Sequence, residues 1–246
     1  MADAALIYGI HAVRAAFAAG IDVREVWVLK QRRDKRLDEL LAAAKRAGVE
    51  AQPADRETLD RLAGTSHHQG VVAKLAHASG PRQVNLDTLI AEAGPDLLLL
   101  VLDGVQDPHN LGACLRTANA AGCQAVVVPR DRAVGLTPVV RKVASGAAEV
   151  TPLIQVTNLA RALRELADAG VRVIGTDDTA GPSLYETDLT GPLALVMGAE
   201  GEGMRRLTGE NCDALVRLPM AGSVSSLNVS VAAGVALFEA RRQRKR

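Results

Sequence analysis

The segment DLLLLVLDGV, residues 96–105, restricts the possible folds of this chain more than any other feature. It is almost continuously apolar, which is typical of a strand in a parallel sheet that is buried on both faces. A helical pattern, NLGACLRTANAAG, and a second apolar strand pattern, CQAVVVP, follow it. Helical segments follow CQAVVVP, and further strands are expected at VRVIGT, LALVMG and DALVRLP. A last helix is expected to begin at Asn228. The alternation predicts an α/β domain with a parallel sheet flanked by helices.

The front of the chain alternates shorter helical and strand patterns. DKRLDELLAAAKRAG has the apolar spacing of one helix face, and QGVVAKLA has the pattern of a strand. Residues 79–83, SGPRQ, contain a Gly-Pro pair and no apolar side chain, and they break this pattern. We therefore predict a small α/β domain over residues 1–76, a linker over 77–95 and the larger domain over 96–246.

Composition narrows the setting in which such a chain works. Apolar residues make up 48% of its 246 positions, enough for a core, but no segment is long and apolar enough to span a membrane. The N-terminal residues lack the pattern of a secretory signal. The three cysteines, Cys114, Cys123 and Cys212, have no CxxC spacing, so neither a disulfide framework nor a metal site is expected. We expect a cytoplasmic protein with no membrane partner and no metal.

The charge distribution is uneven although the net charge is only +1. The last six residues, RRQRKR, carry five positive charges, and Lys30, Arg32, Arg33, Lys35 and Arg36 form a second cluster. Either patch is explained equally well by a solvated surface or by local contacts to nucleic-acid phosphates. Aromatic residues are only 2% of the chain, which argues against a platform that stacks successive bases.

Three expected strand ends carry unusual residues, and ligands of open α/β sheets bind at the carboxyl ends of strands. The first reads LDGVQDPHNLGACLRTANAAG, in which Asp107 or Asn110 can cap the helix. Arg116 lies less than two turns after Asn110. A cation near a helix start opposes the helix dipole, so its partner is either a carboxylate or an anionic substrate.

The second strand end, LALVMGAEGEGM, places Glu200 and Glu202 between three glycines. The lysine and hydroxyl residue of a P-loop are absent, and so is GxGxxG, which disfavours a nucleotide-dependent oxidoreductase. The third, LPMAGSVSSLN, crowds small and hydroxyl residues before the last helix. Such a stretch leaves backbone groups accessible to an adenosine-like ligand. Helix capping alone is the alternative explanation of Ser226 and Asn228.

Taken in this order, the three segments resemble the signature motifs of the SpoU (TrmH) family of SPOUT RNA 2′-O-methyltransferases. RKVASGA, residues 141–147, is similar to the intermediate helix of that family. IYGIHAVRAAF and HHQGVVAKL in the front segment resemble the substrate-binding domain of one subfamily, the bacterial 23S rRNA (guanosine-2′-O-)-methyltransferases. That subfamily methylates a guanosine ribose in the peptidyl-transferase region.

The resemblance implies a trefoil-knotted SPOUT domain, a front domain like ribosomal protein L30e, and a homodimer that binds ribosomal RNA. Periodicity alone predicts an unknotted sheet. The implied methyl donor is S-adenosylmethionine. By motif position, the donor is expected to contact a set of glycine and apolar residues: Gly198, Leu218, Leu227, Met197 and Met220.

The resemblance also implies that Arg116 is the catalytic residue. Four further residues are expected to orient Arg116 and the ribose, namely Asn110, Glu200, Ser226 and Asn228. Because guanidinium has a pKa of about 12 or above, stabilisation of a developing alkoxide suits Arg116 better than a role as base. Two alternatives stay open. The chain could be a tRNA ribose methyltransferase of the same family, or a non-catalytic RNA-binding protein associated with ribosomes.

Overall fold

The computed structural model describes residues 6–18, 20–76, 85–92, 94–199, 201 and 203–245. Contacts between residues divide the chain into two compact units. The first contains the front of the chain through residue 76 together with Ser145–Val150, and the second contains the described residues from 85 onward apart from that segment.

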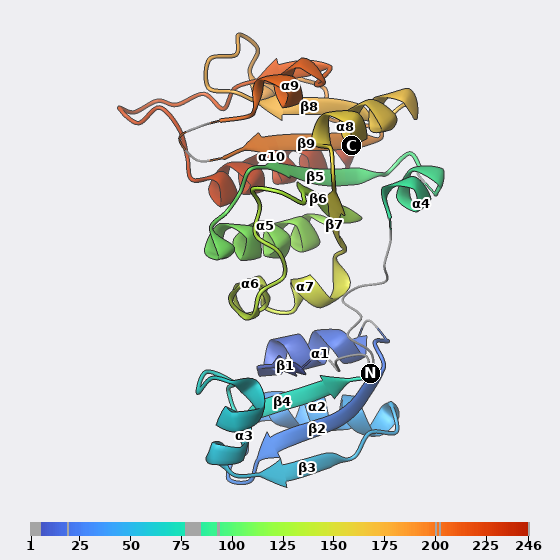
Figure 1. The fold of residues 1–246 in the computed structure, drawn as a ribbon, viewed down its shortest axis with the longest axis vertical. Coiled ribbons are helices and arrows are strands. Elements are labelled where there is room, and N and C mark those ends of the chain that lie inside the picture. The colour runs from blue at the N-terminus through green and yellow to red at the C-terminus, as the bar shows by residue number, and fades with distance from the viewer. Residues whose placement is uncertain are drawn as a thin grey trace. The chain divides into compact units, whose positions relative to one another are not determined.

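The first unit is built on a mixed four-stranded sheet (Figure 1). Its strand order is β1-β4-β2-β3, in which only the β2–β3 pair is parallel. The elements in chain order are β1 (Leu6–Tyr8), α1 (Ile10–Ala18), β2 (Val23–Leu29), α2 (Lys35–Arg46), β3 (Ala51–Ala54), α3 (Arg56–Ala63) and β4 (Val71–Leu75). Helices α1 and α2 bury their apolar stripes in one core with β2 and β4.

The second unit contains six parallel strands in the order β10-β8-β9-β5-β6-β7. The strands are β5 (Leu98–Asp103), β6 (Ala125–Pro129), β7 (Leu153–Val156), β8 (Arg172–Thr176), β9 (Leu193–Gly198) and β10 (Ala214–Val216). The helices are α4 (Leu86–Ala91), α5 (Pro108–Ala121), α6 (Pro138–Ala144), α8 (Leu159–Asp168), η1 (Leu184–Glu186), α9 (Arg206–Glu210) and α10 (Val229–Arg244), while α7 (Ala147–Val150) groups with the first unit. This architecture confirms the predicted α/β class with a helix-flanked parallel sheet.

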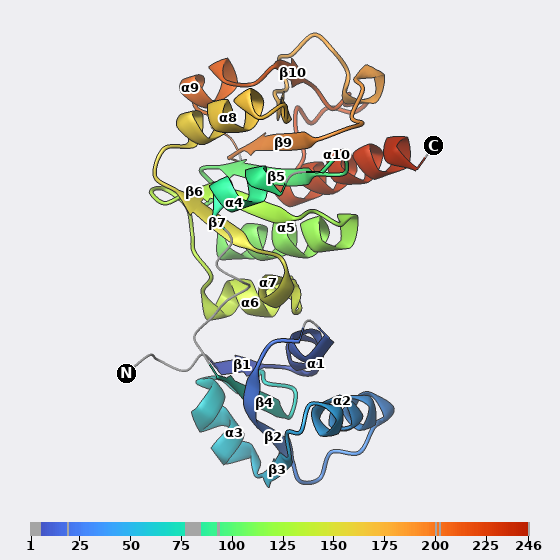
Figure 2. The ribbon, with the colours of Figure 1, turned by 90° about the vertical axis from the view of Figure 1, so that its right-hand side faces the viewer.

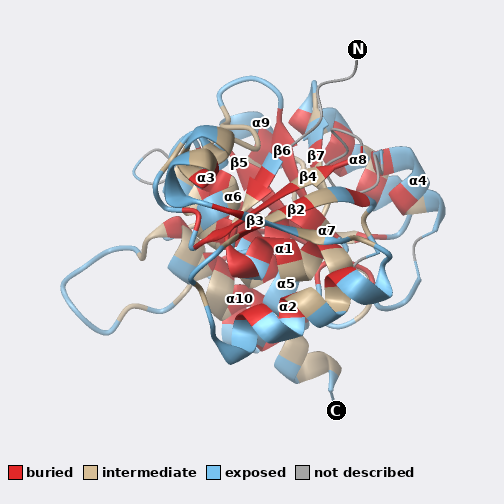
Figure 3. Cartoon of the chain, turned by 90° about the horizontal axis from the view of Figure 1, so that it is seen from below, coloured by how far each residue is buried: buried red, intermediate tan, exposed pale blue. Residues whose placement is uncertain are grey.

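Every residue of β5 is buried, as its apolar run predicted. Leu99 and Val101 face a core that includes α4 and α8. Helices α5 and α10 cover the opposite face, where they pack on each other (Figure 2). Figure 3 shows mostly buried strands and exposed residues on the outer helix faces. Central strand β5 therefore ends in the interior of the unit, between its two helical layers.

Helix ends follow the local sequence signals. Asp107, one of the two predicted capping residues, accepts a hydrogen bond from the His109 amide at 2.8 Å at the start of α5. The helix ends at Gly122, whose φ of +75° is one that glycine adopts without strain. Asn110 therefore lies inside the first turn of α5, and its side chain is available for another partner.

The predicted domain boundaries stay predictions, because part of the predicted linker, residues 77–84 and 93, lies outside the described residues. Helix α4 lies within that linker, and its Leu86 and Leu89 belong to the core of the second unit. The trefoil knot likewise stays a prediction from the family resemblance. No helix among the described ranges combines the length and the apolarity needed to cross a bilayer.

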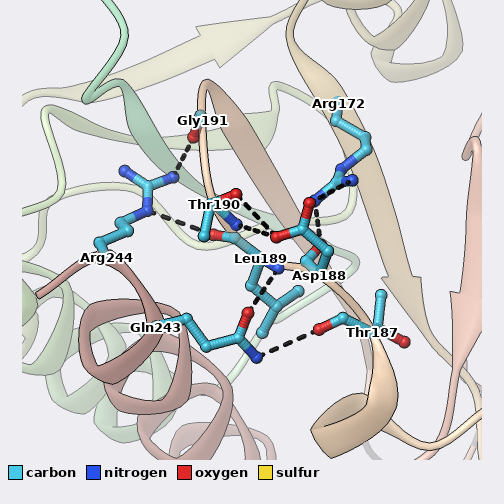
Figure 4. Close-up of polar contacts among 8 residues, drawn as sticks. All are labelled: Arg172, Thr187, Asp188, Leu189, Thr190, Gly191, Gln243 and Arg244. Carbon is cyan, nitrogen blue, oxygen red and sulfur yellow. Dashed lines mark hydrogen bonds and ion pairs between the residues drawn. The ribbon is translucent and has the colours of Figure 1, made fainter. Parts of the chain in front are cut away.

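The basic tail is partly integrated into the fold, while Lys245 in it is exposed. Arg242 pairs with Glu239 at 2.7 Å, and Gln243 accepts from the Leu189 amide and donates to the Thr187 carbonyl (Figure 4). The Arg244 guanidinium donates to four main-chain carbonyls, those of Asp96, Leu97, Leu189 and Gly191. Carbonyls from two separate turns thus anchor the end of α10, which leaves Arg244 unavailable for nucleic acid.

Candidate functional site

A cavity of about 370 Å³ opens at the carboxyl ends of β8 and β9, beside the start of α10. Its lining comes from three chain segments: Thr176, Asp177, Asp178 and Thr179 after β8; Met197, Gly198, Ala199, Gly201, Gly203 and Met204 at the end of β9; and Leu218, Met220, Ser225, Ser226, Leu227, Val229 and Ala232 after β10 and into α10. The volume is that of a small-molecule site, and its place is where parallel sheets bind ligands.

The end of β9 forms a tight glycine hairpin, defined here as the described residues 198, 199, 201, 203 and 204. Ala199 and Gly203 pair through two backbone hydrogen bonds of 3.0 and 2.9 Å. Gly203 has a φ of +67°, a conformation that side chains other than glycine rarely adopt. A Cβ on Gly198 would lie 2.3 Å from the carbonyl carbon of Gly203. The hairpin therefore folds directly over Gly198, and only glycine fits there.

The segment from residue 221 to 226 is exposed, and it has no regular secondary structure. No backbone–backbone hydrogen bond of the described chain involves residues 218–227. Their amides and carbonyls are therefore open to a ligand, as the small and hydroxyl residues predicted. The segment ends at Asn228, whose side chain accepts from the Ser230 amide at 3.0 Å and so caps α10.

Asn228 also joins the third predicted motif to the first. Its Nδ2 donates to Oδ1 of Asn110 at 3.0 Å, across a sequence separation of 118 residues. The capping explanation of Asn228 is thus correct but incomplete, because the same side chain fixes the start of α10 against the start of α5.

Arg116 lies on α5, and its side chain is exposed. Among the residues that the structure describes, no carboxylate pairs with it. Arg116 is not part of the cavity lining. The alternative in which a carboxylate neutralises this cation therefore finds no support within the described chain, and an external anion remains the candidate partner.

All five residues predicted to contact the methyl donor line one cavity, namely Gly198, Leu218, Leu227, Met197 and Met220. Ser226 lines it as well, whereas Asn110 and Asn228 are joined beside it. Glu200 lies outside the described residues. The roles of these residues stay predictions, but their placement brings the second and third motifs together.

Sequence reasoning missed one of the three segments that line the cavity, the residues after β8. Asp177 accepts from the Thr179 amide at 2.7 Å and from its hydroxyl at 2.6 Å, which shapes this turn. Asp178 is exposed at the rim of the cavity. The sequence contains a signal for this segment, because Asp-Asp-Thr directly follows the apolar strand pattern VRVIGT. Ligands bind at the carboxyl ends of parallel strands, but only three other strand ends were considered.

The cavity chemistry fits S-adenosylmethionine. Met197, Leu218 and Leu227 supply apolar surface suited to an adenine ring, and the accessible backbone after residue 218 offers hydrogen-bond partners. Asp177 and Asp178 provide carboxylates for hydroxyl groups or for the cationic groups of that molecule. The missing side chain at Gly198 lets the Gly203 backbone pack directly against the end of β9 beside the cavity. No group of three or more His, Cys, Asp or Glu side chains in the described ranges is arranged to hold a metal ion.

A separate feature of the first unit is a strained turn beside the predicted basic cluster. Gln69 has a φ of +51°, and its carbonyl accepts a hydrogen bond from Arg32. His68 is buried and fixes the turn, because its Nδ1 accepts from the Gly70 amide at 2.9 Å while Nε2 contacts Asp60 at 2.8 Å. Arg32 is thus a structural residue of the cluster.

The other cations of this cluster are exposed. Of these, Arg33, Lys35 and Arg36 form no ion pair with a residue of the described chain. Their charges are therefore available to phosphate groups of a nucleic acid.

Comparison with known proteins matches both units. A model of the SpoU rRNA methylase family matches residues 97–238, and a model described as RNA 2′-O ribose methyltransferase substrate binding matches residues 6–80. The chain is 59% identical to the 23S rRNA (guanosine-2′-O-)-methyltransferase RlmB of Ralstonia nicotianae, over 99% of this chain and 98% of the relative. The RlmB of Pasteurella multocida is also 59% identical, over 97% and 98%.

Solved structures agree with these sequence matches. A crystal structure of an RNA 2′-O ribose methyltransferase superimposes with a TM-score of 0.80 at 28% identity, covering 99% of this chain and 90% of the other. The SpoU methyltransferase AviRb from Streptomyces viridochromogenes, in complex with the cofactor AdoMet, gives 0.76 at 26% identity, covering 98% and 90%. From these matches and from the motifs at its strand ends, the chain belongs to the SpoU rRNA methylase family.

Proposed function

We propose that this protein uses S-adenosylmethionine to methylate the ribose 2′-oxygen of a guanosine in 23S ribosomal RNA, in the peptidyl-transferase region. The observation that carries the proposal is the single cavity formed by the predicted donor-binding residues of two motifs. The relatives support the substrate, since proteins 54–59% identical over nearly their whole length are named 23S rRNA (guanosine-2′-O-)-methyltransferases.

When bound, the donor supplies a methyl group already activated by the positive charge of its sulfonium. The chain has to hold a sugar hydroxyl in line with that methyl group, and alignment of two reactants contributes on the order of 7–11 kcal/mol. Apolar walls from Met197, Leu218 and Leu227 would exclude water from the donor side. Backbone groups of the glycine hairpin and of residues 218–227 would hold the donor in place.

Arg116 is the proposed catalytic residue. Its exposed guanidinium, without a described carboxylate partner, suits a phosphate of the RNA or the oxygen that becomes negative as its proton leaves. A guanidinium stays protonated in proteins, so this role is electrostatic. Asn110 and Asn228 would position α5, which carries Arg116, against the donor site through their hydrogen bond. Glu200 and Ser226 complete the proposed set as orienting residues.

The RNA partner is proposed to contact the first unit through its exposed cations, Arg33, Lys35 and Arg36. Phosphate contacts of this kind position an RNA without reading its sequence. These contacts would let the first unit bind ribosomal RNA electrostatically, although the net charge of the whole chain is close to zero. Action on ribosomal RNA also suits the expected cytoplasmic location.

The functional form is proposed to be a homodimer. Val231 and Phe238 on α10 are 51% and 53% exposed, and their spacing of seven residues places them on one face of the helix. A second copy of the chain could cover this apolar face. The molar mass measured by light scattering at micromolar concentration should be that of two chains, and a monomeric mass would contradict the proposal.

The test of the activity is methyl transfer to RNA that lacks the modification. The protein is incubated with tritiated-methyl donor and unmodified total RNA, and 2′-O-methylated nucleotides are mapped. Label at a guanosine of 23S RNA supports the proposal, whereas label in transfer RNA supports the tRNA enzyme. Absence of label from every RNA supports the non-catalytic RNA-binding alternative. The Arg116→Ala variant should lose transfer while its donor affinity, measured by calorimetry, stays within a few-fold of wild type.

A further inference from the structure

An ion pair between a buried aspartate and a half-exposed arginine lies next to the donor cavity without lining it. Asp103, the last residue of β5, has a side chain that is 0% exposed. Its Oδ1 accepts from Nε of Arg205 at 2.7 Å and lies 2.6 Å from Nη2, and its Oδ2 accepts from the Arg205 backbone amide at 2.9 Å. One arginine therefore supplies two hydrogen bonds and a further ion-pair contact to one buried carboxylate, across a separation of 102 residues.

Arg205 stands where the glycine hairpin ends. It follows Met204 directly and precedes α9, whose N-cap position it occupies. The hairpin bonds between Ala199 and Gly203 close the loop on itself, but they do not attach its far end to the neighbouring strand. The bonds from Arg205 to Asp103 make that attachment through both side chain and main chain.

The ion pair also lies where the first and second motifs meet. Asp103 is the register partner of Gly198 in the β5–β9 pair. Gly104, the next residue, lies beside the hairpin, since a Cβ there would be in ordinary contact, 3.5 Å, with Cβ of Ala199. The opening end of the hairpin is therefore held by the sheet and its closing end by Arg205.

A role in stability alone is the competing explanation. A buried carboxylate has to be compensated, yet replacing a buried ion pair with apolar side chains of similar size is often neutral or stabilising. An aspartate at the end of an otherwise apolar strand is therefore not required for folding. Two guanidinium nitrogens on one carboxylate oxygen, together with the backbone amide on the other, instead give a fixed orientation, which is what a supporting contact behind a binding loop provides.

We propose that Arg205 is a positioning residue for the methyl donor, which acts by tying the closing end of the glycine hairpin to Asp103. The inference rests on the proposed function, because it assumes that the cavity holds S-adenosylmethionine. Arg205 touches neither donor nor RNA in this proposal. It sets the position of Gly198, Gly201 and Gly203, which line the cavity.

The test compares Arg205→Lys with Arg206→Lys, a matched control whose arginine forms an exposed pair with Glu210. Donor affinity is measured by calorimetry, and amide hydrogen exchange is followed over residues 199–204 without donor. In Arg205→Lys we expect donor affinity to fall by about tenfold, as for loss of a supporting contact, and exchange in the hairpin to accelerate. The kcat at saturating donor and the KM for RNA should change by less than about threefold, since Arg205 does not contact the reacting atoms. Arg206→Lys should change none of these quantities.

A second variant separates positioning from stability. Asp103→Leu/Arg205→Met removes the ion pair without leaving an unpaired buried charge, and we expect it to fold as stably as wild type but to bind donor more weakly. Wild-type donor affinity in this variant, or in folded Arg205→Lys, would overturn the inference. Absence of donor binding by the wild-type protein would instead overturn the proposed function.

Discussion

Replacing Gly198 with alanine perturbs the donor cavity through a single atom. The added Cβ would lie 2.3 Å from the carbonyl carbon of Gly203 and 2.4 Å from the backbone nitrogen of Met204. Ordinary contact begins near 3.4 Å, so the closing end of the hairpin has to move by about 1 Å. Both clashing groups are backbone atoms, so no side-chain rotation relieves the contact.

This displacement acts on binding more than on folding. Overpacking of this kind costs about 1–3 kcal/mol in stability. A misplacement of about 1 Å within a site can cost on the order of a hundredfold in function. We therefore expect the Kd for S-adenosylmethionine to rise about a hundredfold, which corresponds to about 2.7 kcal/mol of binding free energy.

Calorimetric titration of the donor measures this change, and thermal unfolding checks that the variant is folded. Gly181→Ala is the matched control, because a Cβ at Gly181 would meet no atom within 4 Å and its φ is ordinary. Donor affinity should be unchanged in the control. A folded Gly198→Ala protein that binds donor as tightly as wild type would refute the claim that the hairpin shapes the site.

Three further predictions concern the tail, the thiols and the basic cluster. Arg244→Ala removes four hydrogen bonds to carbonyls and should lower the free energy of unfolding, measured in urea, by about 2–3 kcal/mol. The control Arg161→Ala removes an exposed ion pair and should lower it by about 0.5 kcal/mol. Equal losses in the two variants would contradict the anchoring role of Arg244. Burial raises the pKa of Cys114 and Cys123 from 9.0 to about 12, so the folded state favours the neutral thiols. The stability they contribute is full below pH 9 and is lost as the pH rises toward 12, by up to about 1.4 kcal/mol per pH unit for each thiol. Urea unfolding measured from pH 8 to 10 should show a smaller decline in a Cys114→Ala/Cys123→Ala variant, and an identical decline would contradict this. Replacing Arg33, Lys35 and Arg36 with alanine should reduce the slope of log Kd for RNA against log salt concentration by about 2, because three phosphate contacts are lost. An unchanged slope would mean that the RNA binds elsewhere.

Strong local signals made the central elements predictable from sequence. The apolar run of β5 and the cap and glycine that bound α5 were sufficient, because each reflects burial or backbone conformation at the element itself. Short elements gave no such signal. Strand β3, Ala51–Ala54, contains a proline and forms only because it lies at the edge of its sheet, where a missing amide donor is tolerated.

The candidate site was predictable where its chemistry is local. Glycines and small residues after a strand indicate accessible backbone whatever the rest of the fold does. Partners distant in sequence were not predictable, because residue types do not reveal which segments meet. Arg205 reaches Asp103 across 102 residues, and Arg244 bonds to carbonyls up to 148 residues away. The charge of the tail was therefore visible, whereas its use inside the fold was not.

The most direct measurement is a crystal structure of the protein with S-adenosylmethionine. We predict donor density in the cavity formed by the glycine hairpin, the turn after β8 and the segment that leads into α10, in contact with Gly198, Leu218 and Leu227. Density at another place on the protein, with this cavity occupied only by solvent, would contradict the claim that these strand ends form the methyl-donor site.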